Sequence, residues 1–320
     1  MLQALKRALY DLIVWSRVVI YLIPLIKPLV LIYLTRKKSS DVVTDASGAT
    51  INVTKYNGRL YIPSTKDKLL TLPDMRIRKS DVLLCGYPKT GCHWMQEIMH
   101  MLVNNKIELT KYGKEFGGMI DVIPDIILDS LPSPRVLNSH FLYEELPKGV
   151  KENKTKIVYT VRNPKDTVVS YYNHHIKLKP MYGYKGNFND YFQLFMEGNL
   201  DSGSYFDHVL AWDKVIRSQK DNPILLVSFE EMKADPVDVT LRVAEFLGIE
   251  TGREFAAEIA DACDFNKMKS TREKAGSIDA MMFRKGAVGD WRNWLTEEQS
   301  QAMDKMWSER MKDCLYQPIF

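Results

Sequence analysis

The 320-residue chain has few cysteines and no marked excess of charge of either sign. Its four cysteines, Cys85, Cys92, Cys263 and Cys314, are too few and too scattered for a disulfide framework or a CxxC zinc site, and a reducing compartment is the simpler interpretation. The net charge of +4 does not point to nucleic acid, although it suits a protein with a local pocket for an anionic ligand. With 45% hydrophobic and 26% charged residues, disordered, collagen-like and disulfide-dense chains are excluded.

One stretch breaks this even composition. Residues 18–34 are apolar apart from Lys27 and two prolines, and a basic cluster at 36–38 follows them. The stretch is short for a membrane-spanning helix, which needs about 20 mostly apolar residues, and it lacks the cleavage site of a signal peptide. A membrane span, an interfacial anchor whose Lys27 reaches the headgroups, and a helix packed on the protein's own body remain open. Residues 1–38 are therefore predicted as an apolar, helical N-terminal segment and a candidate membrane anchor.

The rest of the chain has no repeats and alternates short apolar runs with helical patterns. Residues 39–54 predict a linker or the start of a surface hairpin, and the domain proper is expected to cover residues 55–320. In that domain, each of three apolar runs precedes a helical pattern: 81–85 before 93–103, 156–161 before 166–175, and 224–229 before 239–247. The pattern predicts a single P-loop-like α/β domain, with a central parallel sheet flanked by helices.

The most informative stretch lies between the first of these runs and its helix. It reads Gly86-Tyr87-Pro88-Lys89-Thr90-Gly91-Cys92-His93-Trp94. A loop in this place directs backbone N–H groups and a helix N-terminus at an anion, and Lys89 adds a mobile positive charge. It is not a Walker A motif, in which the lysine directly follows the second glycine, because Lys89 precedes Gly91. A tight Gly-Pro turn with a solvated lysine is the alternative interpretation.

Four further stretches carry recognisable motifs in the same order along the chain: residues 156–172, 205–212, 229–236 and 283–291. Together with Tyr87 to Trp94 they resemble the cytosolic sulfotransferase family. In that comparison the loop resembles the family's 5′-phosphosulfate loop, residues 156–172 its 3′-phosphate segment, and residues 283–291 its C-terminal nucleotide-binding signature. The resemblance begins near residue 55, and five separated matches are far more specific than one.

The resemblance implies an enzyme that transfers a sulfuryl group from 3′-phosphoadenylyl sulfate (PAPS) to a small alcohol, phenol or amine. It implies no metal and no nucleic-acid partner. It favours a cytoplasmic protein, associated with a membrane surface if residues 1–38 bind one. Residues 112–134 and 182–195 are apolar enough to line an acceptor pocket, although the same composition would serve a core or a lid. Arg292 and Thr296 echo the family's dimer motif, but Glu297 and Gln301 interrupt it, so a homodimer stays open.

The same resemblance assigns the site residues. Lys89 is expected to neutralise charge on the leaving 5′-phosphate. His140, which follows a short strand, is expected to be the general base; a satisfied, partly buried histidine is the alternative. His174, His175 and His208 are assigned to packing or to the surface. The residues expected to bind the nucleotide are Lys89, Thr90, Gly91, Cys92, His93, Trp94, Arg162, Ser170, Phe229, Phe265, Arg284, Lys285 and Gly286.

The chain departs from the family pattern at a few positions. Cys92 and His93 stand where the family usually has two threonines, and Phe229 replaces a frequent tyrosine. Asn138 stands in place of a lysine, which removes a positive charge near the reacting group. These departures support a second hypothesis, a catalytically weakened, nucleotide-binding, membrane-associated protein of the same fold. A P-loop kinase is disfavoured by the position of Lys89.

Overall fold

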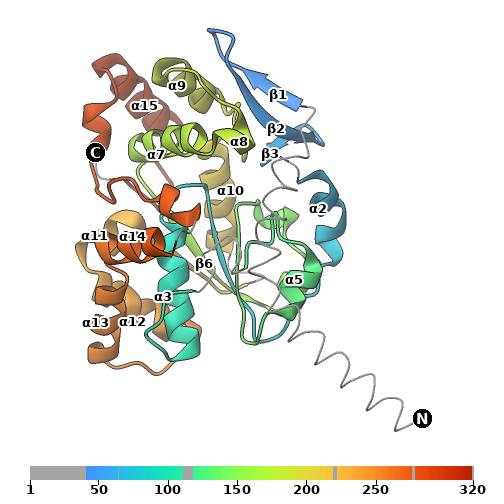
Figure 1. Cartoon of the computed structure of the whole chain (residues 1–320), viewed down its shortest axis with the longest axis vertical. Coiled ribbons are helices and arrows are strands. Elements are labelled where there is room, and N and C mark those ends of the chain that lie inside the picture. The colour runs from blue at the N-terminus through green and yellow to red at the C-terminus, as the bar shows by residue number, and fades with distance from the viewer. Residues whose placement is uncertain (1–40, 64, 111–117, 219–221, 276–277, 319–320) are drawn as a thin grey trace.

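The structure is a computed structural model, and it describes residues 41–63, 65–110, 118–218, 222–275 and 278–318. Residues 1–38, with the candidate anchor, lie outside this part of the chain. Within these ranges no helix combines the length and hydropathy needed to cross a bilayer. The elements, labelled in Figure 1 where there is room, are β1 (Asp41–Thr44), β2 (Thr50–Tyr56), β3 (Arg59–Tyr61), α2 (Lys66–Thr71), η1 (Leu72–Asp74), β4 (Val82–Gly86), α3 (Cys92–Asn104), α5 (Asp125–Ser130), β5 (Val136–Ser139), η2 (Tyr143–Glu145), α6 (Lys148–Glu152), β6 (Lys156–Val161), α7 (Pro164–Lys177), α8 (Lys179–Tyr182), α9 (Phe188–Glu197), α10 (Tyr205–Ser218), β7 (Ile224–Ser228), α11 (Phe229–Ala234), α12 (Pro236–Leu247), α13 (Arg253–Ala262), α14 (Phe265–Lys274), η3 (Ile278–Met282), η4 (Asp290–Asn293) and α15 (Glu297–Arg310).

The centre of the molecule is a parallel sheet of four strands in the order β5-β4-β6-β7. Cys85 of β4 pairs with Ser139 of β5 on one side and with Tyr159 of β6 on the other. The predicted parallel sheet flanked by helices is thus confirmed. Because all four strands run in the same direction, their carboxyl ends lie at one edge of the sheet, where ligands of open α/β sheets bind.

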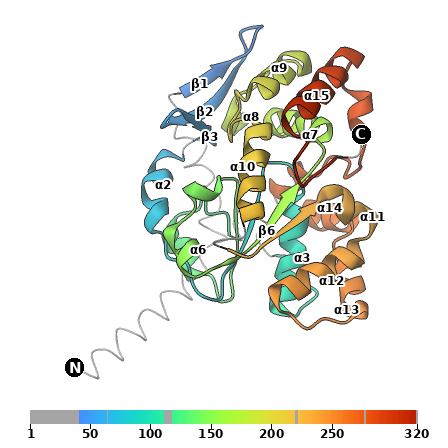
Figure 2. The same cartoon turned by 180° about the vertical axis from the view of Figure 1, so that it is seen from behind.

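Both faces of this sheet are buried. Side chains alternate between the two faces along each strand, and each face packs into an apolar core. Leu83, Ile157 and Tyr159 belong to one apolar core, to which α7 and α10 contribute. Leu84 and Val158 belong to the other, which is built with α3, α12 and α13. The two groups of helices lie on opposite sides of the sheet in Figures 1 and 2. Continuous apolar strands such as 156–161 are expected of a sheet covered on both faces.

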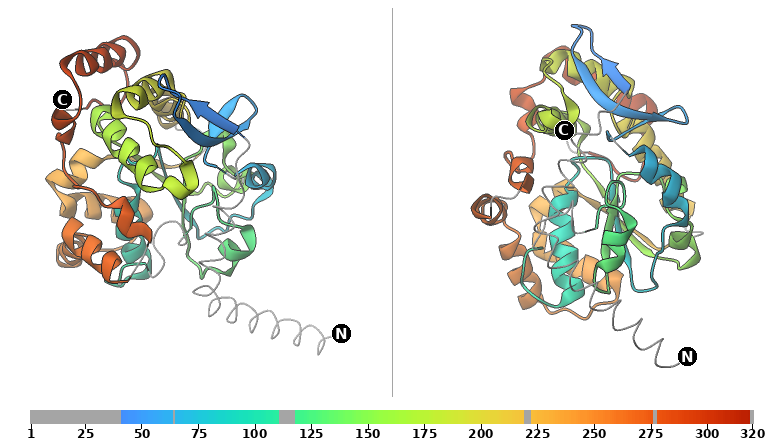
Figure 3. Two further views of the ribbon diagram at one scale, coloured as in Figure 1. Left: turned by 45° about the horizontal axis from the view of Figure 1, so that its top comes forward. Right: turned by 45° about the vertical axis from the view of Figure 1, so that its right-hand side comes forward.

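A second, antiparallel sheet is formed by β1, β2 and β3. It lies beside α8 and α9, as Figure 3 shows from two directions. Of the two sequence-based interpretations of residues 39–54, the linker is replaced over residues 41–54 by the hairpin of β1 and β2. Ile51 and Val53 of this hairpin are fully buried in the main core, so the hairpin packs as part of the domain.

Candidate active site

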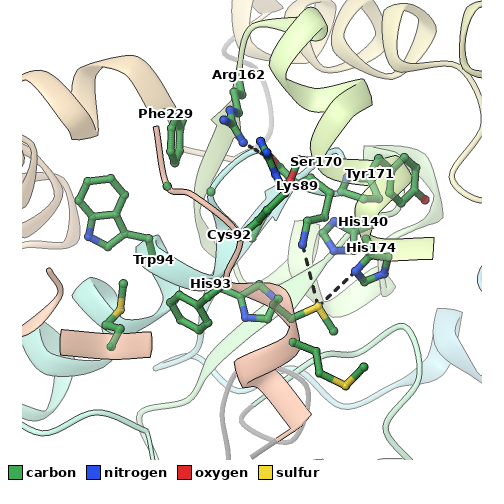
Figure 4. Close-up of a pocket in the computed structure, with 18 of the residues that line it drawn as sticks. Lys89, Cys92, His93, Trp94, His140, Arg162, Ser170, Tyr171, His174 and Phe229 are labelled. Atoms are coloured by element: carbon green, nitrogen blue, oxygen red, sulfur yellow. Dashed lines mark hydrogen bonds between the residues drawn. The ribbon is translucent and has the colours of Figure 1, made fainter. Parts of the chain in front are cut away.

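The carboxyl end of each strand of the parallel sheet leads into a predicted site residue or, for β4, into the phosphate loop. The phosphate loop begins at Gly86, the last residue of β4, and His140 directly follows β5. Arg162 directly follows β6, and Phe229 directly follows β7. His140, Arg162 and Phe229 line a single cavity of about 400 Å³ together with most of the loop. Figure 4 shows this convergence of side chains from distant parts of the sequence.

The phosphate loop is shaped by two residues with positive φ. Gly91, at the N-cap of α3, has a φ of 103°, and Lys89 has a φ of 72°. A β-carbon on Gly91 would also come within 3.0 Å of the Phe229 ring, so glycine is favoured there both by backbone conformation and by space. The loop thereby leads directly into the N-terminus of α3, and the backbone N–H groups and dipole of a helix N-terminus favour an anion.

Thr90 and Cys92 differ in their relation to the cavity. The Thr90 side chain is fully buried, and its hydroxyl donates to the Tyr87 carbonyl (2.7 Å) and contacts the Thr160 hydroxyl (3.1 Å). The Thr90 hydroxyl is thus committed to contacts within the protein, and Thr90 does not line the cavity; its role in phosphate binding stays a prediction. Cys92 belongs to the cavity lining, and its sulfur lies 3.2 Å from the Thr160 hydroxyl.

His140 is held at its ring and at its backbone. Its Nδ1 lies 2.6 Å from the Gly86 carbonyl oxygen. A carbonyl can only accept, so Nδ1 carries the proton and Nε2 is the basic nitrogen of the neutral ring. The His140 backbone N–H donates to Asp121 (2.7 Å), whose other oxygen accepts from Ser139 (2.6 Å). The β4 and β5 ends thus fix both the tautomer and the position of the imidazole.

Three further cations, Arg162, Arg284 and Lys285, line the same cavity. The Arg162 guanidinium is buried, stacks 4.1 Å from the Phe229 ring centroid, and donates to the carbonyls of Lys89 (3.4 Å) and Ala287 (3.0 Å). Burial lowers the pKa of Arg162, and the neighbouring carboxylate of Asp166 opposes that shift.

Arg284 and Lys285 both bind Asp290. Burial raises the pKa of Asp290, but hydrogen bonds from Lys285, Arg284 and Asn293 outweigh it and lower this pKa to about 2. Asp290 is therefore ionised at neutral pH and neutralises part of this positive charge until an anion competes for it.

Aromatic rings form a slot next to the cations. Trp94 and Phe229 pack edge to face with ring centroids 5.9 Å apart. Phe265 and Phe283, which also line the cavity, pack against each other with ring centroids 5.6 Å apart. Gly286, with a φ of 62°, lies so close that a β-carbon would fall 2.2 Å from the Phe265 ring. Flat apolar walls of this kind suit a planar heteroaromatic base.

The same fold occurs in known proteins. A family model described as the sulfotransferase domain matches residues 79–315. The chain belongs to the sulfotransferase family. This sulfotransferase is 33% identical to sulfotransferase 6B1 of Danio rerio over 261 residues, which cover 80% of this chain and 86% of that protein. It is 31% identical to human sulfotransferase 1C2 over 290 residues, or 84% and 96% of the two chains.

Two solved structures resemble this sulfotransferase over most of its length. Mouse sulfotransferase SULT7A1 complexed with PAP superposes with a TM-score of 0.69 at 31% identity, covering 82% of this chain and 94% of that one. Retinol dehydratase in complex with androsterone and the inactive cofactor PAP gives a TM-score of 0.70 at 19% identity, covering 84% and 91%. The second likeness establishes the fold alone.

All of the predicted site residues except Thr90 line this cavity. Asn138 is fully buried and does not belong to this lining. From the predicted acceptor stretches, Met119, Val122, Ile123 and Tyr182 line it, whereas Ile126 is largely exposed.

Sequence reasoning missed residues that also reach the cavity, among them Lys233, His174, Leu178, Met181, Met281 and Met282. A usable signal existed for α7, because Ser170, His174 and Leu178 are spaced by four and so share one helix face.

Proposed function

We propose that this sulfotransferase transfers a sulfuryl group from PAPS to the hydroxyl or amine of a small apolar acceptor, with His140 as general base and Lys89 stabilising the leaving phosphate. The observation that carries the proposal is the joint position of these two residues. Lys89 and His140 line the same cavity, and the Gly86 carbonyl that ends β4 holds His140 Nδ1. Two structural relatives are PAP complexes, and PAP (adenosine 3′,5′-bisphosphate) is the product that PAPS leaves.

The donor set of the cavity fits a nucleotide with two phosphate groups. The N-terminus of α3 and Lys89 form one positive end, and Arg162 with Arg284 and Lys285 forms a second. The rings of Trp94, Phe229 and Phe265 line the same cavity. Among the described residues, the buried Arg162 Nε and Trp94 Nε1 have no hydrogen-bond partner, and buried donors of this kind normally find one. A bisphosphate nucleotide supplies both anions and an aromatic base.

The chemistry then follows from three groups of the protein. His140 Nε2 takes the proton of the acceptor hydroxyl as its oxygen forms a bond to sulfur. The donor supplies the sulfuryl group, and the electron pair of its broken S–O bond remains on the phosphate. Lys89 and the α3 N-terminus stabilise that growing negative charge. Because positioning and charge stabilisation dominate transfers of this type, the preorganised edge of the sheet does most of the catalysis.

The acceptor side of the cavity is apolar, which supports an acceptor with a hydrocarbon or aromatic body. Its walls come from Ile62, Ile123, Leu178, Met181 and Tyr182. Retinol dehydratase, which has this fold, has been crystallised with retinol and with androsterone. A screen of phenols, sterols, aliphatic alcohols and amines with labelled PAPS identifies the class that this chain accepts.

The proposal is tested by Lys89→Ala and His140→Ala. Each variant should lose at least about 100-fold in turnover, because each removes one group that acts in the transition state. Melting temperature should change little, since both side chains line a cavity. Sulfate transfer from labelled donor and thermal unfolding are the measurements, with His100→Ala on the far part of α3 as the matched control. Full activity in both variants would refute the assignment.

We also propose that the protein is cytoplasmic and that residues 1–38 attach it to a membrane surface. The support is the composition of the segment: an apolar run at 18–34 followed by the basic residues 36–38. An apolar stretch next to lysine and arginine suits the boundary between acyl chains and anionic headgroups.

A further inference from the structure

A second histidine lies in the reaction cavity. His174 is on the face of α7 that also presents Ser170, one turn earlier, and Leu178, just beyond the helix. The sequence assigned His174 to packing or to the surface; in the structure all three residues line the cavity. The rings of Tyr171 and Tyr182 pack around the imidazole, with centroids 5.9 Å and 5.5 Å away. These contacts hold the His174 ring in the wall of the cavity.

The His174 imidazole and the Lys89 side chain are directed at the same atom. His174 Nδ1 lies 3.2 Å from the sulfur of Met282, and Lys89 Nζ lies 4.0 Å from that same atom. Figure 4 draws both interactions as dashed lines that meet at one sulfur. A thioether can only accept a hydrogen bond, so both nitrogens act as donors there. The sulfur therefore marks a point that Lys89 and His174 reach together.

Met282 is suited to leave this point when a better acceptor arrives. It ends η3, the short helix before Arg284 and Lys285, and its unbranched side chain has three rotatable bonds. A thioether is a weak acceptor, whereas a charged oxygen forms hydrogen bonds that are about twice as strong as neutral ones. An anionic oxygen will therefore displace the sulfur from the two nitrogens.

We propose that His174, together with Lys89, donates a hydrogen bond to the sulfuryl group during its transfer, at the position that the Met282 sulfur occupies in this structure. The inference rests on the proposed function. During transfer the acceptor oxygen bonds to sulfur, its proton passes to His140, and the S–O bond to phosphate breaks with its electron pair left on phosphate. His174 Nδ1–H and Lys89 bind oxygens of the same reacting centre. His174 is a catalytic residue in this scheme, because it touches the reacting atoms.

The test compares His174→Phe, which keeps the ring size but removes the donor, with His174→Gln, which keeps an N–H donor. Single-turnover transfer from labelled PAPS, acceptor KM, PAP affinity by calorimetry and melting temperature are measured for each. We expect His174→Phe to lower the single-turnover rate about 10- to 100-fold, with the other three quantities unchanged. His174→Gln should recover part of the rate. The same two substitutions at His100, which lies on α3 outside the cavity lining, should leave every quantity unchanged.

The outcomes separate this inference from the function on which it rests. A wild-type rate in His174→Phe overturns the role of His174 and leaves sulfuryl transfer standing. A rise in acceptor KM alone also overturns it, because the residue would then recognise the acceptor. Absence of transfer in the wild-type enzyme with every acceptor class overturns both. If His174→Phe does not fold, His174→Leu provides the same comparison.

Discussion

At the scale of single residues, the neutral side chain of His208 contacts the backbone of His140, the proposed base. His208 is buried, its Nε2–H donates to the His140 carbonyl (3.2 Å), and its Nδ1 accepts from the Tyr159 hydroxyl (3.1 Å). Burial lowers the pKa of His208 from 6.5 to about 3, although the bond to the His140 carbonyl opposes this shift. One donor and one acceptor are the needs of a neutral imidazole, so the site holds His208 uncharged.

This neutral histidine predicts a specific loss of stability in acid. Between pH 6.5 and pH 3 the unfolded chain binds a proton at His208 that the folded chain does not. The stability from this residue is complete above pH 6.5 and falls by about 1.4 kcal/mol per pH unit below it. In His208→Gln that loss is absent. The difference in free energy of unfolding between wild type and variant should therefore shrink from pH 7.5 to pH 5 in urea titrations; a constant difference would contradict the neutral state.

At the scale of elements, the first turn of α7 holds the segment that carries Arg284 and Lys285. The fully buried Asp166 accepts from the backbone N–H groups of Gly289 (2.7 Å) and Trp291 (3.1 Å). A carboxylate accepts both bonds, whereas an amide must turn its NH₂ group toward one of the two donors.

Asp166→Asn should therefore weaken PAP binding about tenfold, since an unsatisfied buried donor costs 1–3 kcal/mol. Isothermal calorimetry with PAP measures this effect. Asp313→Asn, the same change at an exposed position, is the control and should bind PAP like wild type. An unchanged affinity in folded Asp166→Asn would show that the segment does not depend on this anchor.

Much of the architecture could be read from apolar runs and turn residues. The strand pattern at 156–161 matches β6, and the helical pattern at 239–247 falls within α12, which ends at Leu247. These features are local, so sequence periodicity contains them. The motifs also identified residues that the sheet edge brings together.

Other features could not be predicted because they depend on distant contacts. The polar composition of residues 39–50 did not reveal that Ile51 and Val53 would be buried under the main core. The Thr90 hydroxyl contacts the hydroxyl of Thr160 in β6, which is distant in the sequence. His174 shared a helix face with Ser170, but periodicity does not say which face of a helix a cavity borders.

At the scale of the whole molecule, the proposed membrane attachment gives a further prediction. Full-length protein should float with vesicles of phosphatidylcholine and phosphatidylserine, and an Ile26→Glu, Leu31→Glu double variant should not, because burying two carboxylates in the acyl region is unfavourable. Leu315→Glu, at an exposed apolar position, is the control and should float like wild type. Wild-type protein that stays in the aqueous fraction would refute the attachment.

The carbonyl of Gly86 couples the phosphate loop to the imidazole across the sheet edge. The same residue ends β4, opens the phosphate loop and accepts from Nδ1 of His140. One peptide unit therefore sets the start of the loop and the orientation of the ring, so a displacement of this peptide moves both together.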